Sequence, residues 1–257
     1  MNSAKFLNFL SLLCFLAAVV YAICMFIYPW LGTNGNWIYV QVVWDRWQAL
    51  NVGILAFFAS VIAFNISRFN ADQQRSREFL AAKAFLPAAF DELSEYFKYS
   101  ASILERVWNS QPIESNEIDP TQLHSDYRVI FEKCIRHASP GVGRYLVGVL
   151  VQLQVHNARV KQLARRAEGT LGTHSDRSNI ITYLYCLGIL QALINRNFDF
   201  ARNAAPFDPE PLKWEDLRNA YRNLNVRYEN YRVEGYPNLE DFTKRAVGRG
   251  TRTREYP

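Results

Sequence analysis

Apolar residues dominate the first part of the chain, and apolar residues recur at helical spacing among polar ones over the rest. No charged residue stands between Lys5 and Asp45, and none stands between Arg46 and Arg68. Nearly all of the charge therefore follows residue 67. The 257-residue chain divides into an apolar N-terminal segment and a polar body, and different physical rules govern the folding of each.

The N-terminal segment contains two uncharged runs, over 6–30 and 47–67, that are each long enough to cross a membrane. At about 1.5 Å per residue, about 20 apolar residues cross the roughly 30 Å of bilayer hydrocarbon. A cleaved signal peptide is the alternative for the first run, but its apolar core would be only about 7 to 15 residues long. A second run also follows. The pattern predicts a transmembrane hairpin over 1–67 with a short external loop at 31–46.

Aromatic residues gather at one end of both runs. The stretch WIYVQVVWDRW, residues 37–47, is almost entirely aromatic and β-branched, with Asp45 and Arg46 near its end. Indole and phenol rings settle at the level of lipid headgroups because they combine an apolar body with a polar edge. We interpret this stretch as an interfacial segment leading into the second run, rather than as a strand without a partner. The interfacial aromatic residues are Tyr28, Trp30, Trp37, Tyr39, Trp44 and Trp47.

Cations predict which side of the membrane the ends of the chain face. Lys5 precedes the first run, several arginines follow the second, and the loop between the runs has no net charge. Positively charged residues beside spans stay on the cytoplasmic side. The pattern predicts a multi-pass protein of the plasma (inner) membrane with both termini in the cytoplasm.

Small side chains recur at spacings of three and four in both runs, which places them on one face of each helix. Helices in lipid associate through close approach at small residues, because apolar burial provides no drive there. We expect these faces to hold the hairpin together, with a subunit interface as the alternative. Polar residues are too few for a pore lining. The membrane-packing residues are Ser11, Cys14, Ala18, Ala22, Ala49, Gly53, Ala56, Ser60 and Ala63.

The polar body has helical periodicity and almost no strand signal, which predicts an all-α fold with a cytoplasmic helical bundle. The second run has no Gly or Pro after it until Pro87, so its helix is expected to continue and then kink or restart there. A final long helix is expected from about 212 to 234. The predicted domains are the hairpin at 1–67, a juxtamembrane helix at 68–110, the bundle at 111–247 and a basic, disordered tail at 248–257.

Candidate chemistry in the body is sparse. Cys134 and Cys186 are isolated on apolar helical faces, as buried free thiols are. No C-x-x-C or H-x-x-x-H spacing is present, so no metal site and no cofactor is predicted. His156 lies on an apolar face, where a packed and hydrogen-bonded histidine is more common than a catalytic one. No catalytic residue is predicted, and an enzyme is the less favoured class.

Basic residues provide one further signal, since the chain carries a formal net charge of +5. Each cation near an anionic inner leaflet contributes about 1 kcal/mol of attraction. A solvated tail is the simplest alternative, and nucleic acid is a less favoured partner for these residues. The candidate anionic-lipid contacts are Arg68, Arg75, Arg77, Lys244, Arg245, Arg249, Arg252 and Arg254.

Three functional hypotheses follow from these patterns. The first is a membrane-anchored, non-enzymatic interaction or scaffold module, whose partners are the lipid bilayer and a second copy or another protein bound through the helical body. The second is a sensor or effector whose body gates the hairpin through the helix that continues from the second run. The third is an enzyme with a dispersed cytoplasmic site around His156.

Overall fold

The structure, a computed structural model, describes residues 3–32, 34–111, 126–167, 177–232 and 238–248. The described residues form helices and turns and include no strand, which confirms the expected all-α class. The chain separates into two compact units, residues 1–74 and 75–257.

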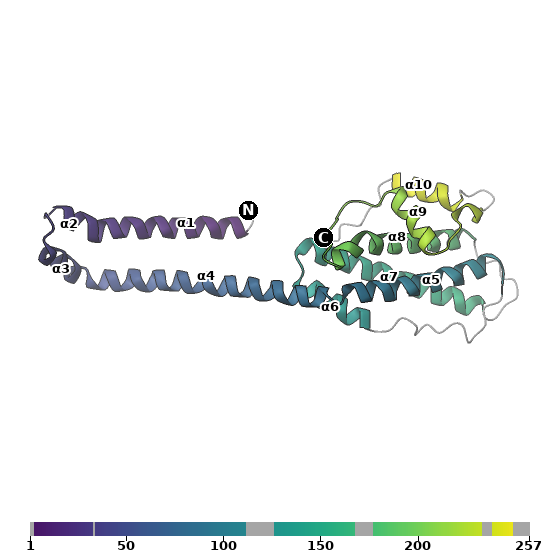
Figure 1. The fold of residues 1–257 in the computed structure, drawn as a ribbon, viewed down its shortest axis with the longest axis horizontal. Helices are drawn as coiled ribbons and strands as arrows, with labels where there is room; N and C mark the ends of the chain where they lie inside the picture. The colour runs from purple at the N-terminus through teal and green to yellow at the C-terminus, as the bar shows by residue number, and fades with distance from the viewer. Residues whose placement is uncertain (1–2, 33, 112–125, 168–176, 233–237, 249–257) are drawn as a thin grey trace. The chain divides into compact units, whose positions relative to one another are not determined.

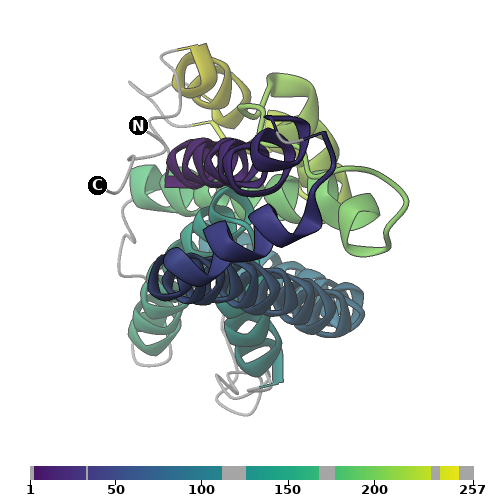
Figure 2. The same cartoon turned by 90° about the vertical axis from the view of Figure 1, so that its left-hand side faces the viewer.

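The first unit is a helical hairpin. α1 (Ser3–Ala22) continues through a π-helical turn, η1 (Ile23–Ile27), into α2 (Tyr28–Gly32). α3 (Trp37–Arg46) then leads to α4 (Gln48–Lys83), so that α1 and the first half of α4 run in opposite directions (Figure 1). Figure 2 shows α3 at the closed end of this hairpin. The aromatic stretch is therefore helical over 37–46, with Trp47 in the turn that follows, and the strand alternative is excluded.

The second unit is a helical bundle around α8 (Arg177–Ala201), which contacts α5, α7, α9 and α10. The surrounding helices are α5 (Leu86–Trp108), α6 (Asp126–His137), α7 (Pro140–Ala167), α9 (Trp214–Asn223) and α10 (Leu239–Gly248), with a short 3-10 turn η2 (Tyr228–Asn230). Figure 1 shows these helices as one packed group.

The apolar stripes of the sequence form the core of this bundle. Leu86, Leu93, Phe97 and Leu104 of α5, spaced at helical intervals, are each fully buried. Full burial of one such side chain contributes about 1.5 to 3 kcal/mol. α5 therefore belongs to the compact unit that begins at Arg75. The predicted division into a juxtamembrane helix at 68–110 and a bundle at 111–247 stays a prediction. The described part of the bundle also extends to Gly248 of α10, and the remainder of the predicted tail, 249–257, lies outside the described residues.

Prolines and left-handed residues set the helix ends. α4 runs unbroken to Lys83, and α5 begins anew at Leu86 with Pro87 in its first turn, where the missing N–H is not needed. α9 ends at Asn223, well before the predicted end near residue 234. Asn225 has a left-handed φ of 58°, and the Val226 N–H donates to the carbonyl of Tyr221, which closes the helix in a Schellman motif.

Candidate functional site

The first unit presents most of its large apolar side chains to its surroundings. Within the described ranges, three helical stretches are long and apolar enough to cross a membrane: Leu12–Gly32, Gln48–Trp108 and Arg177–Ala201. Half of the apolar window of the third, 50%, is buried in the bundle, whereas only 6% is buried in each of the other two. Soluble monomers rarely expose an apolar surface of this extent, so it marks a site that lipid or protein covers.

A chain of hydrogen bonds closes the hairpin. Asn51 in α4 is only 4% exposed, and its Oδ1 accepts a hydrogen bond from the hydroxyl of Tyr21 at 2.6 Å. Its Nδ2 donates to the carbonyl of Trp44 at 3.3 Å. The indole Nε1 of Trp44 in turn donates to the carbonyl of Met25, in the π-helical turn, at 3.3 Å. The network ties α1, η1, α3 and α4 together and pairs polar groups that an apolar medium would leave unsatisfied.

The predicted interfacial aromatic residues lie together around the closed end of the hairpin. All are exposed except Trp44, whose ring is half-buried by the contact just described. Trp30 and Trp37 pack edge to face with ring centroids 5.9 Å apart. Gly35, with a φ of 84°, brings the backbone against the Trp30 ring, and its N–H donates to the Trp30 carbonyl at 3.0 Å. An open cavity of about 390 Å³ adjoins this pair, lined by Ile27, Trp30, Leu31, Trp37 and Val40.

The small residues of the two runs differ in their surroundings. Cys14 and Ala18 of α1 are half-buried, whereas Ala22 and all five members of the set on α4 are exposed, and no side chain lies near Gly53. The half-buried and buried face of α4 carries larger residues instead, namely Asn51, Ile54, Phe58 and Val61. The side chain of Ser11 lies outside the described part. A packing role for the small residues of either run stays a prediction.

The candidate lipid-contacting cations have different surroundings. Arg68 is half-buried and Arg77 is exposed. Arg75 donates to the carbonyls of His137 and Ala138, at 3.2 and 2.8 Å, which stabilises the C-terminus of α6.

At the other end of the bundle, Lys244 pairs with Glu240 at 2.6 Å and lies over the Trp214 ring, 5.1 Å from its centroid. Arg245 also has a polar or ring contact. Arg249, Arg252 and Arg254 lie outside the described residues. A role of any of these residues at a lipid surface stays a prediction.

His156 is packed inside the bundle but is not hydrogen-bonded, so half of the expectation for it was wrong. His156 is 2% exposed, and neither of its ring nitrogens has a hydrogen-bond partner within the described ranges. Burial, and to a smaller extent the nearby Arg159 cation, lowers the pKa of His156 to about 4, so the ring is neutral at pH 7. Catalysis would require substrate to reach this ring. A cavity on the surface of α7 does not include it; that cavity is lined by Ala158, Lys161, Gln162 and Arg165.

Lys83 and Cys134 are further reactive groups that the bundle buries. The Lys83 ammonium lies 3.6 Å from the centroid of the Phe200 ring, and burial lowers its pKa. Burial raises the pKa of the Cys134 thiol to about 11, so it stays protonated and is a poor nucleophile at neutral pH. Cys134 is therefore a free thiol with a packing role, as its apolar helical face predicted.

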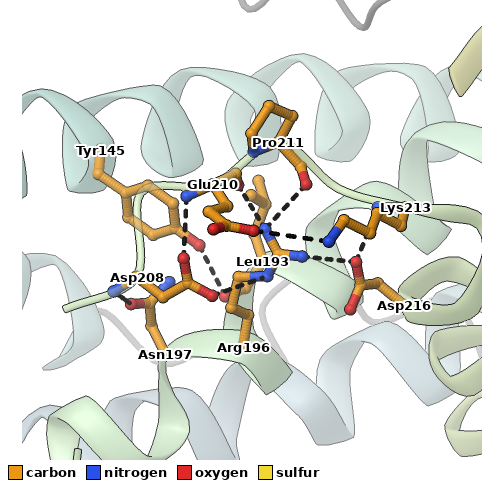
Figure 3. A network of polar contacts seen from close by, with 9 residues as sticks. All are labelled: Tyr145, Leu193, Arg196, Asn197, Asp208, Glu210, Pro211, Lys213 and Asp216. Carbon is orange, nitrogen blue, oxygen red and sulfur yellow. Dashed lines mark hydrogen bonds and ion pairs between the residues drawn. The ribbon is translucent and has the colours of Figure 1, made fainter. Parts of the chain in front are cut away.

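Arg196 organises a polar network at the surface of α8 (Figure 3). Its side chain is 10% exposed and pairs with Asp216 at 2.6 Å and with Asp208 at 3.5 Å. It also donates to the carbonyls of Glu210 and Pro211. All three guanidinium nitrogens are therefore engaged, and this arginine stabilises the segment that connects α8 to α9. It is not available to bind a substrate carboxylate or phosphate.

The hydrogen bonds of Tyr21 and the network of Arg196 were not foreseen in the sequence. An asparagine in an apolar run, such as Asn51, signals a polar partner nearby, and a single arginine late in an apolar helix signals a buried ion pair. Comparison with known proteins gives no match: no family model, curated protein or solved structure is detectably similar to this chain. The described residues contain no group of three or more His, Cys, Asp or Glu side chains that could hold a metal ion.

Proposed function

We propose that this chain is an integral protein of the plasma (inner) membrane, with its hairpin in the bilayer and its helical bundle in the cytoplasm. The observation that carries the proposal is the exposure of the apolar side chains of α1 and the first half of α4, in contrast to the buried apolar core of the second unit. Lipid covers such a surface without an ordered partner, and the aromatic residues at the closed end of the hairpin suit the headgroup level.

The distribution of charge supports the orientation. Beyond its uncharged run, α4 carries a series of cations. Arg75 among them contacts the end of α6, and its neighbours Arg68 and Arg77 are half-buried and exposed, respectively. The closed end of the hairpin has only the adjacent Asp45 and Arg46, which cancel. This asymmetry favours a cytoplasmic bundle and a short external turn.

The bundle acts as an interaction or scaffold module in this proposal. Two of its buried polar groups suit a structural role: all three guanidinium nitrogens of Arg196 contact carboxylates or carbonyls, and neither ring nitrogen of the neutral His156 has a hydrogen-bond partner among the described residues. An acid or base at work needs both a partner and access to substrate. These surroundings favour a binding role for the bundle over the hypothesis of a dispersed catalytic site.

Fractionation and topology reporters test the membrane placement. After an alkaline carbonate wash, the full chain is expected in the membrane pellet, and reporters fused to its C-terminus are expected to report the cytoplasm. A matched control replaces three exposed apolar residues of the first run, Leu13, Leu16 and Val20, with lysine and should release the protein. Release of the unaltered chain by carbonate, or a C-terminus outside the cell, would contradict the proposal.

Cross-linking in membranes tests the binding role. Amine-reactive cross-linking of the full chain in its native membrane should yield discrete adducts of defined mass, whether with a second copy or with another protein. A chain that stays monomeric at every cross-linker concentration, and that co-purifies with nothing, is not a scaffold.

A second candidate function is a sensor or effector whose bundle gates the hairpin. It is favoured by the uninterrupted helix α4, which begins within the apolar run at Gln48 and ends at the buried Lys83. A rigid helix transmits displacement, whereas a flexible linker does not. Induced expression should then dissipate the membrane potential, and Ala71→Pro, which breaks the helix, should abolish the effect. An unchanged potential during expression of the native chain would eliminate this candidate.

A further inference from the structure

One face of α4 carries large apolar side chains that nothing in the described chain covers. Leu55, Ile62, Ile66, Phe69 and Leu80 are between 55% and 63% exposed. With the intervening Ala59, Gln73 and Ser76, they follow one another at alternating steps of four and three residues. Because α4 is a single helix from Gln48 to Lys83, this register follows from helical geometry alone.

We propose that this face is the seam of a parallel homodimer, in which α4 of one copy packs along α4 of a second. In heptad terms, Ala59, Ile66, Gln73 and Leu80 take the a positions, and Leu55, Ile62, Phe69 and Ser76 take the d positions. The proposal rests on the proposed membrane insertion, since two copies inserted with the same orientation bring their α4 helices together in parallel.

Lipid cannot cover the far end of the seam. Leu80 follows Ser67, the last residue of the uncharged run, by 13 residues, which is about 20 Å of helix. The headgroup layer extends only about 5 to 8 Å beyond the hydrocarbon. Even a helix tilt of about 40° leaves Leu80 about 15 Å from the hydrocarbon. Water therefore surrounds the exposed Leu80 side chain, and an apolar face that lipid does not reach marks a contact with protein.

Charge complementarity identifies that protein as a second copy. Asp72 occupies a g position and Arg77 occupies the following e position, five residues later, and both are exposed. In a parallel pair, the g residue of one helix meets the following e residue of the other, so Asp72 opposes the partner's Arg77 on both sides of the two-fold axis. Gln73 at an a position is a polar residue of the kind that fixes a two-stranded parallel register at some expense of stability.

The seam is also compatible with the contacts that α4 already makes. The hairpin uses Asn51, Ile54 and Phe58, which occupy c and g positions. Near the end of α4, the residues packed in the bundle include Ala82, at a c position, and Lys83, at the d position that follows Leu80. The seam ends at Leu80, so pairing from Leu55 to Leu80 displaces neither contact.

Disulfide cross-linking tests the seam at single positions. In a full chain whose four native cysteines are replaced by alanine, Gln73→Cys should give a disulfide-linked dimer under mild oxidation in native membranes. The matched control Ala71→Cys lies at an f position, on the opposite side of the helix, and should stay monomeric. Absence of the Gln73→Cys dimer, or equal cross-linking at Ala71→Cys, would overturn the seam.

Charge reversal tests the partner. Asp72→Arg places like charges together twice and should lower the dimer yield of Gln73→Cys by about fivefold to tenfold. The added reversal Arg77→Asp should restore the yield, which a purely local effect on folding would not do. Failure of this restoration, or an adduct with the mass of a different protein, would overturn pairing with a second copy. Both experiments are read in carbonate-washed membranes, so loss of the chain from the pellet reports failure of membrane insertion, whereas a retained monomer reports failure of the seam alone.

Discussion

His156 is a polar side chain that the bundle buries without a hydrogen bond. Its pKa is lowered from 6.5 to about 4, so the unfolded chain binds a proton more readily than the folded one as the pH falls below 6.5. Stability contributed by the neutral ring is present above pH 6.5 and is lost as the pH falls toward 4. At pH 5, this loss amounts to about 2 kcal/mol of unfolding free energy.

His156→Leu should remove that pH dependence, because leucine fills much of the same space and takes up no proton. We expect the decrease in unfolding free energy between pH 7 and pH 5 to be smaller by about 2 kcal/mol in the variant than in the native chain. Urea titration of the full chain in detergent, followed by helix content, provides the measurement. Parallel pH profiles for the two proteins would mean that the folded bundle accommodates the charged imidazolium.

Arg196 has the opposite character, since all three of its guanidinium nitrogens are engaged. Arg196→Met removes the guanidinium from Asp208, Asp216 and two carbonyls, and removal of one member of a buried pair costs about 3 to 5 kcal/mol. Asp216 keeps the backbone N–H of Lys213 as a hydrogen-bond donor. We expect a loss near the lower end of this range because Asp216 is 29% exposed. Lys98→Met, at an exposed lysine paired with Glu95, is the control and should change stability by less than about 0.5 kcal/mol. Chemical unfolding at pH 7 compares the two variants. Equal losses of unfolding free energy would show that the Arg196 network contributes no more to stability than an exposed ion pair.

At the scale of elements, Gly188 determines how closely α8 and α9 approach. A Cβ at this position would lie 2.6 Å from Cε1 of Tyr221, a ring that is fully buried and whose hydroxyl is 2.8 Å from Oγ1 of Thr243. The ring cannot turn aside without losing that hydrogen bond. Gly188→Ala should therefore destabilise the bundle by about 1 to 3 kcal/mol, despite the higher helix propensity of alanine.

Gly148 in α7 offers a matched comparison, because a Cβ built there would meet nothing within 4 Å among the described residues beyond the adjoining backbone of its own helix. Gly148→Ala gains helix propensity alone and should stabilise the chain by up to about 1 kcal/mol. Thermal unfolding in detergent would then shift in opposite directions for the two variants. A shift in the same direction for both would contradict the close packing of α8 on Tyr221.

The sequence predicted helices well where apolar periodicity is strong, as in α5 and α8, because burial of a regular stripe leaves few alternatives. It failed at the end of α9, where Trp214, Tyr221 and Tyr228 keep a seven-residue spacing although the helix stops at Asn223. Tyr228 reaches the Trp214 ring from a separate turn, with centroids 5.5 Å apart. The seven-residue aromatic spacing therefore continues beyond the end of α9. The residue that indicated the helix would end is Asn225, because asparagine tolerates a left-handed backbone conformation.

The sequence predicted the kind of surface that the candidate site presents, but not which residues contact one another there. The apolar runs and the aromatic residues at one end of them could be identified because both features depend only on local sequence. The choice of packing face depends on more than local sequence: Ile54 and Phe58 of α4 are half-buried, whereas the small residues of the same helix are exposed. Which of several apolar faces meets a given neighbour depends on the turn geometry of α2 and α3, and this cannot be read from periodicity.

At the scale of the whole molecule, the two units differ in what they need in order to fold. The second unit buries its large apolar residues in one continuous core that includes Leu86, Phe131, Leu187 and Leu217, whereas the first exposes most of its own. A unit with its own core folds without help, and a unit with an exposed apolar surface depends on its surroundings. We therefore expect the second unit to be soluble by itself, and self-association to require the part of α4 in the first unit.

Residues 75–257, expressed without the first unit, should form a soluble, monomeric helical bundle with cooperative unfolding. The fragment retains Arg75, Glu78 and Lys83, which hold α6 and α8, but lacks the seam positions before residue 75. A shorter fragment, 86–257, loses these three contacts and serves as the control, with an unfolding midpoint below that of 75–257. Light scattering and urea titration measure both properties. A dimer of 75–257 would place self-association in the bundle instead of α4, and a fragment that unfolds without a cooperative transition would mean that the bundle depends on the hairpin for its structure.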